Sequence, residues 1–119
     1  MPDISVVLIT TNEAARLESC IASCRTFADE IVVVDGGSGD GTPHLARSLG
    51  CAVYENEWPG YARQRNFGAD HAANDWILWI DADEVISAEL AASLSEWKRS
   101  WDGKTSAFAV KRVGDFLGR

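Results

Sequence analysis

The stretch Trp76-Ile-Leu-Trp-Ile-Asp-Ala-Asp-Glu84 joins an unbroken apolar run to three acidic residues. The run Trp76–Ile80 has neither helical nor alternating spacing, which is typical of a strand buried on both faces of a sheet. Asp81 and Asp83 follow as an i, i+2 pair, and on an extended backbone such a pair directs both carboxylates to one side. Two hard oxygen donors at the end of a strand suit Mg²⁺ or Mn²⁺ shared with a substrate phosphate. The alternative is a solvated acidic turn that leads into the next helix.

Strand and helix patterns alternate on both sides of this stretch. Further strands are expected at Ile4–Thr10, Glu30–Asp35, Cys51–Tyr54 and Lys104–Val113. Helices are expected around Leu17, Cys20, Ile21 and Cys24, from a Thr42 cap and Pro43 to Gly50, at Tyr61–Ala73, and after a Ser87 cap. This alternation predicts an α/β fold with a mostly parallel sheet, helices on both faces and right-handed crossovers. A chain of 119 residues is expected to form one domain.

Composition narrows the classes of function. The net charge is −7, and no Lys/Arg cluster is present to neutralise a phosphate backbone, so nucleic acid is not an expected partner. The three cysteines form no ligand cluster, and Cys20 and Cys24 fall on the apolar face of a predicted helix, which favours buried reduced thiols. The sequence shows neither a signal peptide nor a membrane span. We therefore expect a cytoplasmic protein.

Polar side chains follow the first, second and fourth predicted strands. They are Thr10, Thr11, Asn12 and Glu13 after the first strand, Asp35 after the second, and Asp81, Asp83 and Glu84 after the fourth. Ligands of open α/β sheets bind beyond the carboxyl ends of the strands, where the strand order reverses. The sequence therefore predicts a nucleotide cleft in which carboxylates hold ribose and metal, and backbone N–H groups contact phosphate.

Two loops allow more than one interpretation. The glycine-rich loop 36–41 matches neither the dinucleotide fingerprint nor the phosphate loop, and it is expected mainly to form a tight turn with positive φ. Calcium binding through Asp35, Ser38 and Asp40 is disfavoured because the EF-hand pattern is missing. In the second loop, Trp58 and Tyr61 either stack on a sugar or base, or simply anchor the loop.

Basic residues are few, and three polar residues open the predicted third helix. Arg63, Gln64 and Arg65 at that helix start could form an anion site. The alternative is a solvated helix face.

Together these residues resemble the N-terminal half of a family 2 glycosyltransferase, an inverting enzyme of the GT-A fold, which is Rossmann-like. The matching segments appear in the family's order at Ile4–Glu13, Glu30–Thr42, Arg65–Gly68 and Trp76–Glu84. Within the family, residues 58–68 and the terminal Asp115–Arg119 are similar to the bacterial branch that adds a β-glucosyl residue to lipopolysaccharide inner core.

The resemblance implies a role for individual residues. Thr10 and Glu13 would lie against the nucleoside, Asp35 would bond the uracil ring, Arg65 would contact the nucleotide, Asp81 would approach the ribose, and Asp83 would ligate the divalent cation, Mg²⁺ or Mn²⁺. The donor would be a UDP-sugar, with glucose expected, and the acceptor a saccharide or lipid-linked saccharide such as lipopolysaccharide core. Glu84 would lie behind the metal ligands or face the acceptor. Peripheral membrane contact, at the inner face of the bacterial inner membrane, would come through the full-length protein.

The resemblance also implies a missing part. In this family the catalytic base lies well beyond the Asp-x-Asp motif, which is Asp81-Ala-Asp83 here, so we expect the base beyond Arg119. Glu84, Glu89 and Asp115 are not assigned this role. The chain is therefore expected to be a fragment that holds the donor half and is inactive alone.

Three other functions compete with this one. A non-catalytic nucleotide- or metal-binding module remains open, and downstream coding sequence with another acidic motif would argue against it. A nucleotidyltransferase is the nearest enzymatic rival, but it usually carries a glycine- and basic-rich loop after the first strand. A dinucleotide-dependent oxidoreductase is disfavoured because Thr10–Glu13 lacks the glycine turn that admits a pyrophosphate.

Overall fold

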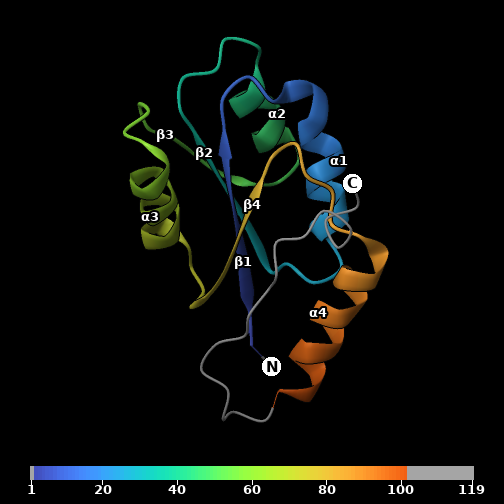
Figure 1. Cartoon of the computed structure of the whole chain (residues 1–119). Helices are drawn as coiled ribbons and strands as arrows, with labels where there is room; N and C mark the ends of the chain where they lie inside the picture. Colours follow the sequence, from blue (N-terminus) through green and yellow to red (C-terminus); the bar gives the residue numbers. More distant parts are fainter. Residues whose placement is uncertain (1, 102–119) are drawn as a thin grey trace.

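Strands and helices alternate through residues 2–101, the part of the chain that the computed structural model describes (Figure 1). The elements are β1 (Ile4–Thr10), α1 (Ala14–Cys24), β2 (Glu30–Asp35), α2 (Thr42–Ser48), β3 (Ala52–Glu55), α3 (Tyr61–His71), β4 (Trp76–Asp81) and α4 (Ala88–Ser100). Each element predicted within this range is present, with ends that differ by up to two residues. The strand predicted at Lys104–Val113 lies outside the described residues.

The four strands form one parallel sheet in the order β3-β2-β1-β4. The chain moves outward from β1 to β3 and then crosses back to place β4 on the other side of β1. In the register of the sheet, Thr10 pairs with Asp35 of β2, and Ile9 pairs with Asp81 of β4. The polar residues at these strand ends therefore lie along one edge, at the point where the strand order reverses.

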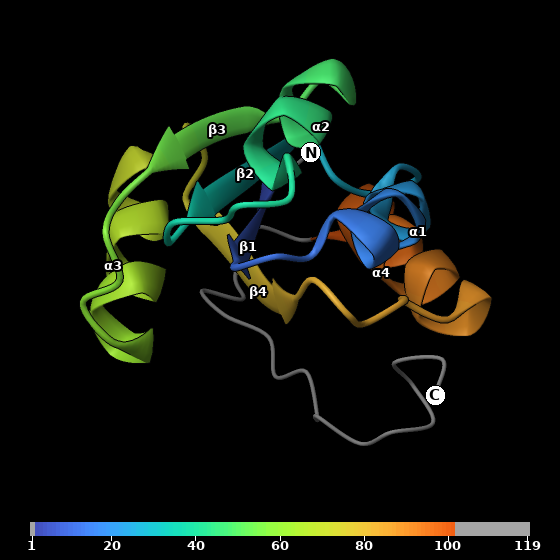
Figure 2. The ribbon, with the colours of Figure 1, turned by 90° about the horizontal axis from the view of Figure 1, so that it is seen from above.

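Helices cover both faces of the sheet, as predicted. Figure 2 shows α1, α2 and α4 on one face and α3 alone on the other. Alternate residues of β1 face opposite ways: Val6 and Leu8 pack in the core beneath α1, α2 and α4, whereas Val7 packs with Val32 and Val34 on the side of α3. Among residues 2–101, no helix is both long enough and apolar enough to cross a bilayer.

Two helix starts differ in how they are capped. The Ser87 hydroxyl accepts the N–H of Leu90 at 3.1 Å, which confirms the predicted cap of α4. The predicted Thr42 cap is wrong, because Thr42 is already the first residue of α2 and Gly41 precedes it with φ = 84°. The N–H of Thr42 instead donates to Asp40 Oδ1 at 3.1 Å.

Candidate functional site

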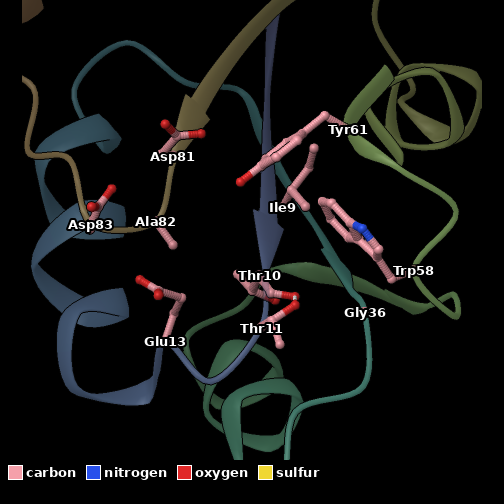
Figure 3. Close-up of a pocket in the computed structure, with 10 residues that line it drawn as sticks. All are labelled: Ile9, Thr10, Thr11, Glu13, Gly36, Trp58, Tyr61, Asp81, Ala82 and Asp83. Carbon is pink, nitrogen blue, oxygen red and sulfur yellow. Dashed lines mark hydrogen bonds between the residues drawn. The ribbon is translucent and has the colours of Figure 1, made fainter. Parts of the chain in front are cut away.

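A pocket of about 450 Å³ opens at the carboxyl ends of β1 and β4 (Figure 3). It is lined by Ile9, Thr10, Thr11, Glu13, Gly36, Trp58, Tyr61, Asp81, Ala82 and Asp83. Five residues predicted from the strand ends thus share one cavity: Thr10, Thr11, Glu13, Asp81 and Asp83. Among residues 2–101, the lining holds three carboxylates and no basic side chain, so on these residues an anionic diphosphate would need a cation to bind here.

The acidic end of β4 is a turn, and the extended i, i+2 geometry predicted for its two aspartates is wrong. Asp81 is the last strand residue, and the Glu84 N–H donates to the Asp81 carbonyl at 3.0 Å, which closes a four-residue turn. Ala82 is 2% exposed and packs in the core, whereas Asp83 is exposed. Because the turn is anchored through Ala82, both Asp81 and Asp83 still line the pocket.

Glu13 presents an unused acceptor on this pocket. Its Oε1 accepts a hydrogen bond from the Arg16 guanidinium at 3.0 Å. Its Oε2 is buried and has no hydrogen-bond partner among the described residues. A buried carboxylate oxygen without a partner is costly, so this atom marks a place where a ligand hydroxyl, N–H group or cation would be stabilised.

Asp35 lies beneath the pocket and is not one of its lining residues. It is 1% exposed, and it accepts hydrogen bonds from the Thr10 hydroxyl, the Gly37 N–H and both the hydroxyl and N–H of Ser38. Burial acts to raise the pKa of Asp35, but these hydrogen bonds outweigh it and hold the pKa below its ordinary value. Two carboxylate oxygens offer about four acceptor positions, so the four donors occupy them.

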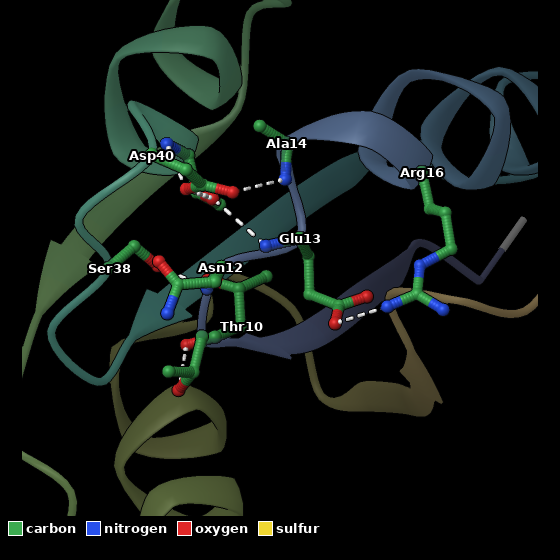
Figure 4. A network of polar contacts seen from close by, with 9 residues as sticks. Thr10, Asn12, Glu13, Ala14, Arg16, Ser38 and Asp40 are labelled. Carbon is green, nitrogen blue, oxygen red and sulfur yellow. Dashed lines mark hydrogen bonds and ion pairs between the residues drawn. The ribbon is translucent and has the colours of Figure 1, made fainter.

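The loops after β1 and β2 are tied together by a second aspartate (Figure 4). Asp40 Oδ2 accepts the Ala14 N–H at 3.1 Å, so this residue caps α1 from the neighbouring loop as well as accepting from Thr42 at the start of α2. The Thr42 hydroxyl also donates to Asp40, and these bonds lower the pKa of the Asp40 carboxyl. Glu13 joins the network because its N–H donates to Thr42 Oγ1 at 3.1 Å. Asp40 therefore holds two helix starts, which argues against its use as a calcium ligand.

An aromatic pair forms the wall of the pocket that faces the two aspartates. The rings of Trp58 and Tyr61 meet edge to face with centroids 4.8 Å apart, and their exposed fractions are 41% and 66%. Gln64 fixes the loop that carries Trp58: it accepts from the Asn56 amide at 2.8 Å and donates to the Asn56 carbonyl at 2.9 Å. Gln64 is fully buried. The residues around Gln64 in the sequence did not predict this role. The one available signal was that Gln64 is a polar residue at a position of α3 that is buried.

The predicted arginine contacts lie apart from the other site residues. Arg63 is exposed, Arg65 is half-buried, and neither lines the pocket. The backbone carbonyl of Arg65 accepts a hydrogen bond from Trp79 Nε1 at 3.2 Å, which links α3 to β4.

The carboxylates of the pocket fit a divalent cation that is shared with a ligand. Within residues 2–101, no group of three or more His, Cys, Asp or Glu side chains is arranged to hold a metal by itself. Mg²⁺ typically takes one or two protein carboxylates and completes its shell with water and substrate phosphates. Asp83 offers one such carboxylate, Asp81 lies beside it in the turn, and the orphan oxygen of Glu13 lies on the same pocket.

The family model "Glycosyl transferase family 2" matches residues 5–102, which include every element described above except the first residue of β1. The chain belongs to this family. Its parallel sheet and helices are the α/β, Rossmann-like arrangement of GT-A glycosyltransferases, as predicted.

Individual relatives are longer than this chain. It is 46% identical over 90 residues to an uncharacterized glycosyltransferase of Rickettsia prowazekii, an alignment that covers 76% of this chain and 31% of the relative. It is 40% identical over 99 residues to the lipopolysaccharide core biosynthesis glycosyltransferase LpsC of Rhizobium meliloti, covering 78% and 36%. The chain thus spans about a third of the length of these relatives.

Solved structures include similar folds with a bound nucleotide. Glucosyl-3-phosphoglycerate synthase from Mycobacterium tuberculosis was crystallised with Mn²⁺, UDP and glucosyl-3-phosphoglycerate. It aligns with a TM-score of 0.62 and 30% identity over 71% of this chain and 34% of that chain.

Proposed function

We propose that this chain forms the donor-nucleotide and metal-binding part of a glycosyltransferase that uses a UDP-sugar. The observation that carries the proposal is the pocket in which Thr10, Glu13, Asp81 and Asp83 converge at the reversal of strand order. The acidic lining and the aromatic wall together suit a nucleoside diphosphate bound with a cation. The similarity to a synthase crystallised with Mn²⁺ and UDP supports the same ligand class.

The proposed contacts are those that the resemblance to the family implies for these residues. Asp83, exposed on the turn, is proposed to ligate Mg²⁺ or Mn²⁺, and Asp81 to approach the ribose. Thr10 and Glu13 are proposed to lie against the nucleoside, with Glu13 Oε2 as an acceptor. Asp35 would reach the uracil only by exchanging one of its present hydrogen bonds for a bond to the base.

Arg65 is proposed to contact the nucleotide from α3. Since it does not line the pocket, this contact requires its side chain to turn toward the ligand.

The cation would supply charge stabilisation to the leaving group. In glycosyl transfer that group is a nucleoside diphosphate, on which negative charge develops. The residues of this chain would hold the cation, through Asp83, and orient the nucleoside. Deprotonation of the acceptor hydroxyl is assigned to a carboxylate outside this sequence.

The finer proposals concern the sugar, the acceptor and the location. Glucose as the donor sugar and lipopolysaccharide core as the acceptor are supported by the similarity to LpsC and to glucosyl-3-phosphoglycerate synthase. A cytoplasmic location is supported by Cys20 and Cys24, which are buried free thiols. Contact with the inner face of a bacterial inner membrane is proposed only for the longer protein.

The test is a calorimetric titration of UDP into the folded 119-residue chain, once with Mn²⁺ and once with a chelator. We expect Mn²⁺ to strengthen UDP binding and Asp83→Asn to weaken the Mn²⁺-dependent binding by about tenfold or more, or about 1.4 kcal/mol. Asp70→Asn is the matched control, because Asp70 is an exposed aspartate on α3 that does not line the pocket. Mn²⁺-independent binding, or equal effects of the two substitutions, would overturn the proposal.

A further inference from the structure

Glu84 is a buried carboxylate directly behind the two aspartates of the pocket. It is completely inaccessible to solvent. Its Oε1 accepts the N–H of Asp81 at 2.8 Å, and its own N–H donates to the carbonyl of Asp81 at 3.0 Å. Both backbone groups of Asp81 are therefore bonded to Glu84, which closes the four-residue turn from both ends.

A buried carboxylate at this position depends on the contacts around it. Removing a carboxylate from water costs several kcal/mol unless hydrogen bonds compensate, and an apolar side chain of similar volume often fills such a space as well or better. The neighbouring positions Ala82 and Ile86 are apolar and are 2% and 4% exposed, so the surroundings would accept an apolar residue. A carboxylate at this position provides the acceptor for the Asp81 N–H, which an apolar side chain could not do.

The turn needs such a brace because it carries like charges. Asp81 and Asp83 of the turn line one pocket, and like charges placed close together disfavour one another when no cation is bound. Mg²⁺ accepts little deviation from octahedral geometry, so its ligands must be held close to their final positions before it binds.

We propose that Glu84 is a positioning residue that holds the turn 81–84 in the form that binds the cation and the diphosphate. The proposal rests on the proposed function of the pocket. Glu84 contacts neither ligand: it acts through the backbone of Asp81, and thereby on the directions in which the Asp81 and Asp83 side chains point.

Three substitutions separate this role from a purely structural one. Glu84→Gln keeps an acceptor oxygen and nearly the same volume. Glu84→Met fills the space without an acceptor, and Glu84→Asp keeps the carboxylate but is one methylene too short to reach the Asp81 N–H. Glu89→Gln is the control, because Glu89 is exposed in the first turn of α4.

Two quantities are measured on the 119-residue chain: the gain in UDP affinity that Mn²⁺ produces, and the hydrogen exchange of the Asp81 amide without ligand. For Glu84→Met and Glu84→Asp we expect the Mn²⁺-dependent gain to fall by about tenfold or more, the size typical of lost supporting contacts at metal sites. Binding of UDP in chelator should change by less than about twofold, because the nucleoside contacts are elsewhere. Exchange of the Asp81 amide should become faster. Glu84→Gln and Glu89→Gln should resemble the wild type.

The inference is overturned if a folded Glu84→Met or Glu84→Asp chain keeps the full Mn²⁺-dependent gain. It is also overturned if Glu84→Gln loses as much as these two, because the acceptor oxygen would then not be the cause. A wild-type chain that shows no Mn²⁺-dependent gain at all would instead overturn the proposed function of the pocket.

Discussion

Gly68 of α3 lies directly against Val7 of β1: a Cβ atom on the glycine would overlap Val7 Cγ1 and would come within 3.1 Å of Val34 Cγ2. The absence of a side chain therefore sets the distance between α3 and the sheet. That distance matters for the site because Tyr61 is the first residue of α3 and Trp58 lies in the loop before it.

We expect Gly68→Ala to destabilise the chain by about 1–3 kcal/mol, because an extra methyl group cannot be placed without moving the helix. Urea unfolding monitored by circular dichroism measures this change. The control is Gly39→Ala, where a Cβ would meet no atom within 4 Å. In a helix that could move freely, alanine would instead stabilise by about 0.5–1 kcal/mol, and that outcome would contradict the tight contact.

Trp58 provides the second prediction. If its ring forms one wall of the nucleotide pocket, Trp58→Ala should weaken Mn²⁺–UDP binding by about 1 kcal/mol, the usual value of a stacked aromatic contact. Trp58→Phe should retain most of the affinity. Because the Trp58 side chain is 41% exposed, neither substitution should lower the melting temperature much. Calorimetry on both variants checks this, and unchanged affinity in Trp58→Ala would assign the ring to anchoring the loop only.

The third prediction concerns Gln64, whose hydrogen bonds to Asn56 hold the loop that carries Trp58. Gln64→Leu removes both hydrogen bonds to Asn56 and leaves their partners without replacements, so we expect a loss of about 1–3 kcal/mol in the free energy of unfolding. The loop that carries Trp58 should also be cleaved faster by a protease. Arg63→Leu, one residue earlier on the exposed face of α3, is the comparison. Equal stability of the two variants would argue against the role of Gln64.

Asp35 gives a prediction on pH. Its folded-state pKa lies below the ordinary value of 3.8, so the unfolded chain binds more protons in that range and stability falls as the pH drops below about 4. Asp35→Asn should lose about 1–3 kcal/mol at pH 7, and its stability should change less than that of the wild type between pH 7 and pH 3. Ser38→Ala, which removes one donor to Asp35, should fall between the two. Urea unfolding at both pH values tests this, and parallel pH profiles would contradict it.

Much of the fold was predictable because its determinants are local. Residues 4–10 and 30–35 were expected as strands and are strands, since β-branched apolar runs of this length have few other stable arrangements. Thr10, Glu13, Asp81 and Asp83 were expected to converge because parallel strands place their carboxyl ends on one edge, and all four line the pocket.

Much of what escaped prediction depends on contacts between distant segments. Asp40 caps α1 from the loop that follows β2, at a separation of 26 residues. Gly68 lies within the helix predicted at Tyr61–Ala73, but its contact with Val7 across the helix–sheet interface could not be predicted from the sequence. The segment Asp81–Asp83 was predicted to be extended, and it is bent instead. This miss is local, because the hydrogen bonds that bend the segment join Asp81 to Glu84, only three residues away.

We propose that a divalent cation binds at the turn 81–84 together with the diphosphate of the nucleotide. The most direct measurement is the broadening of backbone amide resonances when Mn²⁺ replaces Mg²⁺ in the presence of UDP. We expect broadening centred on the amides of Asp81, Ala82 and Asp83, weaker effects at Thr11 and Glu13, and loss of the pattern in Asp83→Asn. Broadening centred elsewhere, for example on Asp40 in the loop after β2, would contradict it.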